Sequence, residues 1–138
     1  MNTTAQSDRR FAFRLDLQSG VPVYRQIIDQ VLGGISTGIL KPGDQLPTVR
    51  QLAVDLAINP NTVVRAYREL EIRDVLATQQ GTGTFITDKK PEKNDVERQR
   101  RIAQMAGELL ARAGAEGITL PELLDYLTEL NKETDRRR

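Results

Sequence analysis

The amino-acid sequence predicts a mostly α-helical protein with one small β-hairpin, arranged as a larger N-terminal part and a helical tail. Three observations lead to this fold class. Two short amphipathic runs are separated only by residues 57–60, and a glycine-containing hairpin pattern follows them at 76–87. Two longer apolar stripes lie beyond a charged, proline-containing stretch at 88–94, so the boundary between the parts is expected at 88–89.

The stretch from Leu46 to Leu70 organises the rest of the chain. Two sets of apolar residues in it follow helical spacing i, i+3, i+4 and i+7: Val49, Leu52, Ala53 and Leu56, then Val63, Ala66, Tyr67 and Leu70. Asn59 is suited to cap the second helix, and Pro60 to its first position, where the missing N–H has no cost. Two short helices joined by so brief a turn form the helix-turn-helix pattern.

The exposed face of the second helix carries hydrogen-bonding side chains near its start, namely Asn61, Thr62 and Arg65. In a helix-turn-helix the second helix enters the major groove of DNA with its N-terminal residues. These side chains are therefore placed to meet base edges or phosphates, and the pattern indicates a DNA-binding regulator.

The segments before these helices predict the rest of the N-terminal part. Apolar residues alternate with polar or small ones from 11 to 17, which favours a short strand or an extended arm. Pro22 is expected to start a helix that Gly38 ends, with Gly33 and Gly34 allowing close packing. The buried stripe of that helix is expected to be Tyr24, Ile27, Ile28, Val31 and Ile35. A Pro-Gly turn with short extended flanks follows at 39–47.

A β-hairpin is predicted directly after the second helix, with arms at 76–79 and 84–87. Its turn is Gln80-Gly81-Thr82-Gly83, where glycine supplies positive φ. A hairpin in this place is a wing, and its tip would let backbone N–H groups approach a phosphate or enter a minor groove. Serving the turn alone is the alternative role of Gly81 and Gly83.

Two amphipathic helices are predicted in the tail, the first from Asp95 and the second capped by Thr119 with Glu122 in capping-box position. Gly114 and Gly117 are expected to bound the turn between them. The residues expected to make a dimer are Ile102, Met105, Leu109, Leu110, Leu120, Leu123, Leu124 and Leu127. One hairpin cannot bury such stripes well alone, so we expect two chains to pair rather than one chain to pack on itself.

The composition argues against an enzyme. The 138 residues include no cysteine and no histidine, which excludes disulfides and thiolate metal sites and removes the usual general base. The carboxylates show no metal-ligand spacing, and Gly81-x-Gly83 lies in a hairpin rather than between a strand and a helix. We therefore expect no catalysis, no metal and no cofactor.

Neither a membrane span nor the hydrophobic segment of a signal peptide is found in the sequence. Together with the absence of cysteine, this predicts a cytoplasmic protein. The net charge of +1 gives no support to DNA binding by itself. Any basic surface must come from the way charges sort between faces of the molecule.

Residues 20–87 resemble the winged helix-turn-helix domain of GntR-type bacterial transcription regulators. After the leading amphipathic helix, the matching segments are GILKPGDQLP (38–47), RQLA (50–53), NTV (61–63), RELE (68–71) and GTGTF (81–85). The two-helix tail, PVYRQI at 22–27 and NPNT at 59–62 are similar to the YtrA subfamily, so the resemblance extends to nearly the whole chain.

This resemblance implies a dimeric repressor that binds a palindromic operator, in this subfamily often that of a transporter operon. It implies DNA contacts at Arg50, at the pair Asn61 and Thr62, and at the wing. The sequence also departs from the family, because Pro60 and Val64 stand where arginines are common and Arg65 where many relatives have glutamate. The operator sequence therefore does not carry over. The residues after 87 leave no room for the ligand-binding domain of larger members, so any effector is unknown.

The full set of residues expected at DNA is Thr48, Arg50, Asn61, Thr62, Arg65, Arg68, Gln80, Gly81, Thr82 and Gly83. Arg50 suits phosphate better than bases, because the first helix of the motif crosses the DNA backbone. Arg65 suits guanine, a contact worth about 1–3 kcal/mol of discrimination, or alternatively an ion pair with Glu69. Arg68 is open between phosphate and a solvated face, and Val64 between a thymine methyl and burial against the wing.

A winged helix that binds a protein partner, without operator binding, is the main alternative function. A binding assay with double-stranded DNA over a salt series separates the two, since only DNA binding depends steeply on salt.

Overall fold

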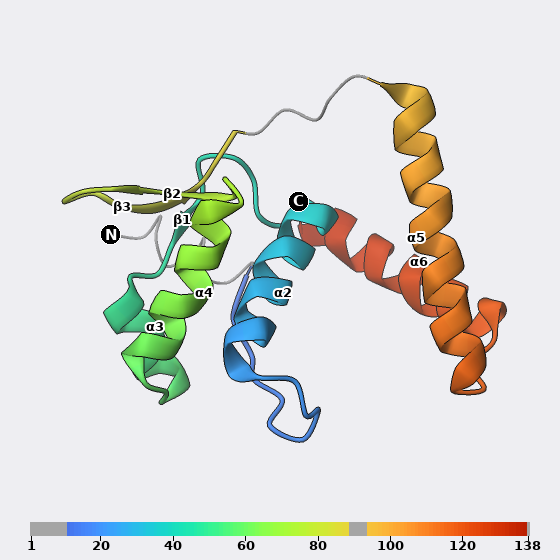
Figure 1. Ribbon diagram of the computed structural model, residues 1–138, viewed down its shortest axis with the longest axis horizontal. Helices are drawn as coiled ribbons and strands as arrows, with labels where there is room; N and C mark the ends of the chain where they lie inside the picture. Colours follow the sequence, from blue (N-terminus) through green and yellow to red (C-terminus); the bar gives the residue numbers. More distant parts are fainter. Residues whose placement is uncertain (1–10, 89–93, 138) are drawn as a thin grey trace. The chain divides into compact units, whose positions relative to one another are not determined.

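The computed structural model describes residues 11–88 and 94–137, and the chain divides into two compact units within Met1–Lys89 and Lys90–Arg136. The first unit contains α2 (Val23–Thr37), β1 (Gln45–Leu46), α3 (Val49–Leu56), α4 (Pro60–Ile72), β2 (Leu76–Gln79) and β3 (Gly83–Ile86) (Figure 1). Two longer helices follow, α5 (Asp95–Ala115) and α6 (Leu120–Arg137). The predicted fold class, mostly helical with a small β wing, is confirmed. Residues 89–93 of the linker expected at 88–94 lie outside the described residues.

Helix α4 is the centre of the first unit, and α2, α3 and β2 all pack against it. Its buried stripe is the predicted one, and Val63, Ala66 and Leu70 are completely inaccessible to solvent. The core around this stripe is completed by Ile27, Ile28, Val31, Leu40, Leu46, Leu52, Ala53, Leu76 and Ile86. One face of α4 is thus fully covered, and the opposite face remains open.

The ends of α3 and α4 are set by the local signals that the sequence contains. The Thr48 hydroxyl accepts from the Gln51 N–H at 3.1 Å and caps α3. The Asn59 side chain accepts from the Asn61 N–H at 2.9 Å and caps α4, which begins with Pro60 as predicted. Ala57 adopts a left-handed conformation with φ of 55° between them, which allows the tight turn.

The sheet has three antiparallel strands in the order β1-β3-β2. Strands β2 and β3 form the predicted hairpin, with Leu76 opposite Ile86 and Gln79 opposite Gly83. Strand β1 pairs Gln45 with Phe85 and Leu46 with Thr84. The sequence predicted only an extended flank at β1, because a strand of two residues is too short to show alternation.

The N-terminal arm is extended but forms no strand between residues 11 and 16, and two glutamines of α2 hold it instead. The Gln30 side chain accepts from the Arg14 N–H at 2.8 Å and donates to the Arg14 carbonyl at 2.6 Å. The Gln26 side chain makes the same pair of hydrogen bonds with Asp16, at 2.8 and 2.9 Å. Two side chains one helical turn apart therefore satisfy alternate residues of the arm, as a neighbouring strand would.

Two details of the predicted helices were wrong. Ile35 is 36% exposed and lies outside the core, because Gly34 occupies the buried position beside it. A Cβ atom at Gly34 would lie 2.9 Å from the Leu40 side chain, so the close packing does require glycine there. Gly114 lies inside α5 rather than at its end, and Gly117 with φ of 74° makes the turn.

The second unit is a pair of helices that run apart from the turn joining them (Figure 1). The predicted capping box at α6 is confirmed: the Thr119 N–H donates to the Glu122 carboxylate at 2.8 Å, and the Glu122 N–H to the Thr119 hydroxyl at 3.4 Å. Asn94 caps α5 by accepting from the Glu97 N–H. Within the described ranges, none of the helices is long and apolar enough to cross a membrane.

We predict that Gln26→Ala lowers the free energy of unfolding by about 1–3 kcal/mol, because it removes a buried side chain that makes partly buried hydrogen bonds to the backbone of the arm. Gln26 is 8% exposed and also donates to the Val21 carbonyl at 2.8 Å. Urea unfolding measures the change as a lower midpoint at an unchanged slope. Gln30→Ala is the control and should cost less, because its bonds to Arg14 are exposed to water. Equal losses in the two variants would contradict this account of the arm.

Candidate nucleic-acid interface

A buried hydrogen bond sets α3 and α4 relative to each other. The Tyr67 hydroxyl, from the core face of α4, donates to the Pro47 carbonyl at 2.8 Å, immediately before the cap of α3. Burial raises the pKa of the Tyr67 phenol above its ordinary value, so the hydroxyl stays protonated and available as a donor. This bond fixes the point from which α3 starts.

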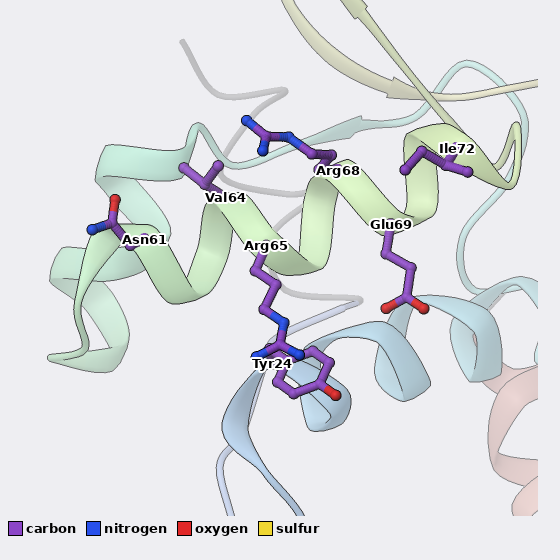
Figure 2. A pocket seen from close by; sticks show the side chains of 7 residues that line it. All are labelled: Tyr24, Asn61, Val64, Arg65, Arg68, Glu69 and Ile72. Carbon is purple, nitrogen blue, oxygen red and sulfur yellow. The ribbon is translucent and has the colours of Figure 1, made fainter.

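The open face of α4 carries the polar residues that the sequence singled out. Asn61, Arg65 and Arg68 are exposed, and Thr62 and Val64 are half-buried. An open hollow of about 530 Å³ runs beside this face, lined by Tyr24, Asn61, Val64, Arg65, Arg68, Glu69 and Ile72 (Figure 2). The hollow therefore brings together three of the predicted DNA-contacting residues with one residue of α2.

The two arginines of this face leave α4 in different directions. In Figure 2, Arg65 reaches toward α2, whereas Arg68 and Val64 point away from it. The Arg65 guanidinium lies 3.7 Å from the centre of the Tyr24 ring, which is the geometry of a cation–π contact. The alternative ion pair of Arg65 with Glu69 is not formed, because Glu69 pairs with Arg73 at 3.3 Å.

Thr48 and Arg50 lie at the start of α3 and are both exposed. The Thr48 hydroxyl is already engaged as the helix cap. Within the described part of the chain, no hydrogen bond or ion pair involves the Arg50 guanidinium, which leaves its donors free for another partner.

The wing turn is held from β1. Residues 80–82 are exposed, Gly81 has φ of 81° and the Thr82 N–H donates to the Gln79 carbonyl at 2.9 Å. The Gln45 side chain donates to the Thr82 carbonyl at 3.2 Å. A Cβ atom at Gly83, whose φ is 140°, would collide with the Gln45 amide nitrogen. The positive φ values of Gly81 and Gly83 therefore favour glycine at both positions of the turn.

A short chain of hydrogen bonds joins the end of α4 to the wing. The Thr78 hydroxyl of β2 donates to the Glu71 carboxylate at 3.0 Å and lies 3.3 Å from the Thr84 hydroxyl of β3. The wing is thus tied both to α4 and, through Gln45, to β1. Helix α4 and the wing are therefore joined by packing and by side-chain hydrogen bonds.

Sequence reasoning missed the roles of two residues in this surface. Tyr24 was assigned to the buried stripe of α2, but it is half-buried and supports Arg65. Gln45 was placed in an extended flank, and its contact with the wing spans 37 residues of sequence. Both contacts join elements distant in sequence, so neither leaves a periodic or local signal.

The residues expected to make a dimer are largely exposed in the single chain. Their exposed fractions run from 39% at Leu110 to 65% at Met105, and only Leu123 is half-buried. Leu120, Leu124 and Leu127 of α6 are about half exposed, at 54%, 56% and 46%. The apolar stripes of α5 and α6 therefore lack a full covering within the described part of one chain.

Helices α2 and α3 packed against α4, with a hairpin directly after α4, define this unit as a winged helix-turn-helix domain. Residues 23–86 match the family of bacterial regulatory proteins called the gntR family. The chain is 35% identical over 120 residues to the HTH-type transcriptional repressor YtrA of Bacillus subtilis, covering 87% of this chain and 92% of that protein. It is 39% identical over 117 residues to the HTH-type transcriptional regulator Rv1152 of Mycobacterium tuberculosis, covering 85% and 92%.

Solved structures of transcription regulators are also similar to this chain. A transcriptional antiterminator from Listeria monocytogenes has a TM-score of 0.66 at 26% identity, covering 91% of this chain and 93% of that one. YtrA from Sulfolobus acidocaldarius, a GntR-family transcription factor, has a TM-score of 0.51 at 34% identity, covering 68% and 95%. The protein belongs to the GntR family, in its YtrA subfamily. It is a DNA-binding transcription regulator.

We predict that Gly83→Ala lowers the free energy of unfolding by about 1–3 kcal/mol, because a φ of 140° lies outside the conformations that alanine adopts readily, while the exposed Gln45 side chain can move away from the new Cβ. Gly81→Ala is the comparison, because its φ of 81° lies closer to the left-handed region open to alanine and no neighbour lies within 4 Å. Urea unfolding of both variants should show the larger loss at residue 83. A larger loss at residue 81 would contradict the described backbone conformation of the wing turn.

Proposed function

We propose that this protein is a homodimeric repressor that places α4 in the major groove at each half of a palindromic operator. The observation that carries the proposal is the contrast between the two faces of α4. Val63, Ala66 and Leu70 are fully buried, whereas Asn61, Arg65 and Arg68 on the other face are exposed. A helix so presented fits the groove, and its first residues meet the base edges.

The remaining residues fall into roles that follow from their elements. We assign base contact to Asn61 and Thr62 in the first turn of α4, and phosphate contact to Thr48 and Arg50 in α3, which crosses the backbone in this motif. The wing tip at 80–83 presents backbone N–H groups to a phosphate or a minor groove. Arg68 is left open between phosphate and solvent, and Arg65 is considered below.

Repression is supported by the names of relatives. The Bacillus subtilis relative is called a transcriptional repressor. Another, from Escherichia coli, is called the mannosyl-D-glycerate transport/metabolism system repressor, at 39% identity over 69 residues and 29% of that protein. A dimer bound over a promoter would act by occluding it. The name of the Escherichia coli relative, which mentions transport, supports control of a transporter operon. With no histidine in the chain, we propose action by binding and not by catalysis.

The dimer is proposed to form through residues 89–138, with residues 1–88 as the DNA-binding part. Leu109, Leu110, Leu124 and Leu127 remain between 39% and 56% exposed in one chain. Apolar stripes of this length need a partner surface, and a second copy offers an identical one in a small helical bundle. Two joined DNA-binding units then gain effective concentration on a two-part operator.

The division of roles is tested with Asn61→Ala and Arg50→Ala in the full chain. Asn61→Ala should weaken binding to the operator by about 1–3 kcal/mol and relax preference at one base position. Arg50→Ala should weaken binding to operator and random duplex alike, and reduce the salt slope by about one unit. Fluorescence anisotropy over a salt series measures both. The absence of any effect in both variants would contradict the placement of α4 and α3 on DNA.

The dimer is tested with Leu124→Glu, which places a charge in the proposed interface. Sedimentation should show a monomer, and affinity for a full operator should fall about 10²-fold, to that for a half-site. Val54→Glu is the control, because Val54 is an exposed apolar residue of α3, at 70%, and should leave the dimer intact. A Leu124→Glu protein that still sediments as a dimer would place the interface elsewhere.

A further inference from the structure

The contact between Arg65 and Tyr24 is an organised feature of the α4 surface. Arg65 lies on the open face of α4, and Tyr24 lies in the first turn of α2. The guanidinium is 3.7 Å from the ring centre, and within the described residues it makes no ion pair or hydrogen bond. Glu69, one turn further along α4, is paired with Arg73 instead.

A guanidinium over an aromatic ring is held by its face, so the N–H groups in its plane stay free to donate. Five such donors in a fixed fork match phosphate and carboxylate oxygens. The ring also removes much of the rotational freedom of the long side chain before any ligand arrives. Tyr24 therefore keeps Arg65 in one position with its donors unused.

That position lies to one side of α4. The major groove is about 12 Å wide and a helix with its side chains is about 10–12 Å across, so α4 would fill the groove. A side chain that bends sideways from such a helix meets the groove wall, where the phosphates run, and not the base edges on the floor. Figure 2 shows Arg65 bending toward α2 in this way, whereas Asn61 and Arg68 do not.

We propose that Arg65 binds a backbone phosphate at the edge of the groove and does not read a base, with Tyr24 as its positioning residue. The surroundings suit an anion: the first turn of α2 contains no acidic residue, and Arg68 lines the same hollow. Glu69 also lines it, but its charge is engaged by Arg73. The proposal rests on the placement of α4 in the major groove proposed above.

The test is a double-mutant cycle of Arg65→Ala and Tyr24→Leu in the full chain. The probes are a duplex selected by this protein from a random-sequence pool and a random duplex of equal length, each over a salt series. Arg65→Ala should weaken binding to both probes by the same factor, on the order of tenfold, and reduce the salt slope by about one. Tyr24→Leu should weaken both about two- to fivefold in the wild-type background, and not at all when Arg65 is absent.

Tyr24→Phe keeps the ring and should bind both probes like the wild type. Weaker binding by this variant would point instead to a need for the hydroxyl or to a general folding defect. Loss of preference at one base pair with an unchanged salt slope in Arg65→Ala would overturn the proposal and make Arg65 a base reader. Equal effects of Tyr24→Leu with and without Arg65 would overturn the role of the stack. Asn61→Ala and Arg50→Ala distinguish failure of this proposal from failure of the proposed function, because the absence of any effect in both variants would contradict the placement of α4 and α3 on DNA.

Discussion

The two-sided character of α4 is the constraint on which the rest of the structure depends. Its buried stripe supplies the surface against which α2, α3 and β2 pack, so each of these elements is located by the same few side chains. Truncating a residue such as Leu70 to alanine in such a site generally costs about 2–5 kcal/mol. The Tyr67 hydroxyl adds direction to this packing through its bond to the Pro47 carbonyl. Because one face is so firmly held, the other face is free to be a binding surface of fixed shape.

The two units differ in how well each covers its own apolar surface. The winged unit encloses a core of residues from every one of its helices and strands. The tail has Ala113 as the buried apolar residue among the described part of α5 and α6, while Met105 and Leu124 stay 65% and 56% exposed. In the proposed dimer this asymmetry would link assembly to function, because the second chain would cover the apolar stripes of the tail and would hold two DNA-binding units together.

Helix caps and buried stripes could be predicted from the sequence, whereas contacts between elements distant in sequence could not. The caps at Asn59 and Thr119 act within three residues, so spacing alone predicted the starts of α4 and α6. The buried stripe of α4 follows from periodicity for the same reason. The cation–π contact of Arg65 with Tyr24 depends on how α2 crosses α4, and the bond from Gln45 to Thr82 on how β1 meets the wing. Such contacts exist only in the assembled fold. The position of Arg65 on a helical face therefore did not predict its contact with the Tyr24 ring.

The placement of α4 in the major groove can be measured directly, because the chain contains no cysteine. A single thiol introduced by Asn61→Cys can carry an iron chelate that cleaves nearby DNA. Ile72→Cys provides a matched site, exposed on the same face but about 16 Å further along the helix. We expect strong DNA cleavage from residue 61 within each half-site, and much weaker cleavage from residue 72. Equal cleavage from the two positions, measured with the operator saturated by each labelled protein, would contradict the placement of α4 in the groove.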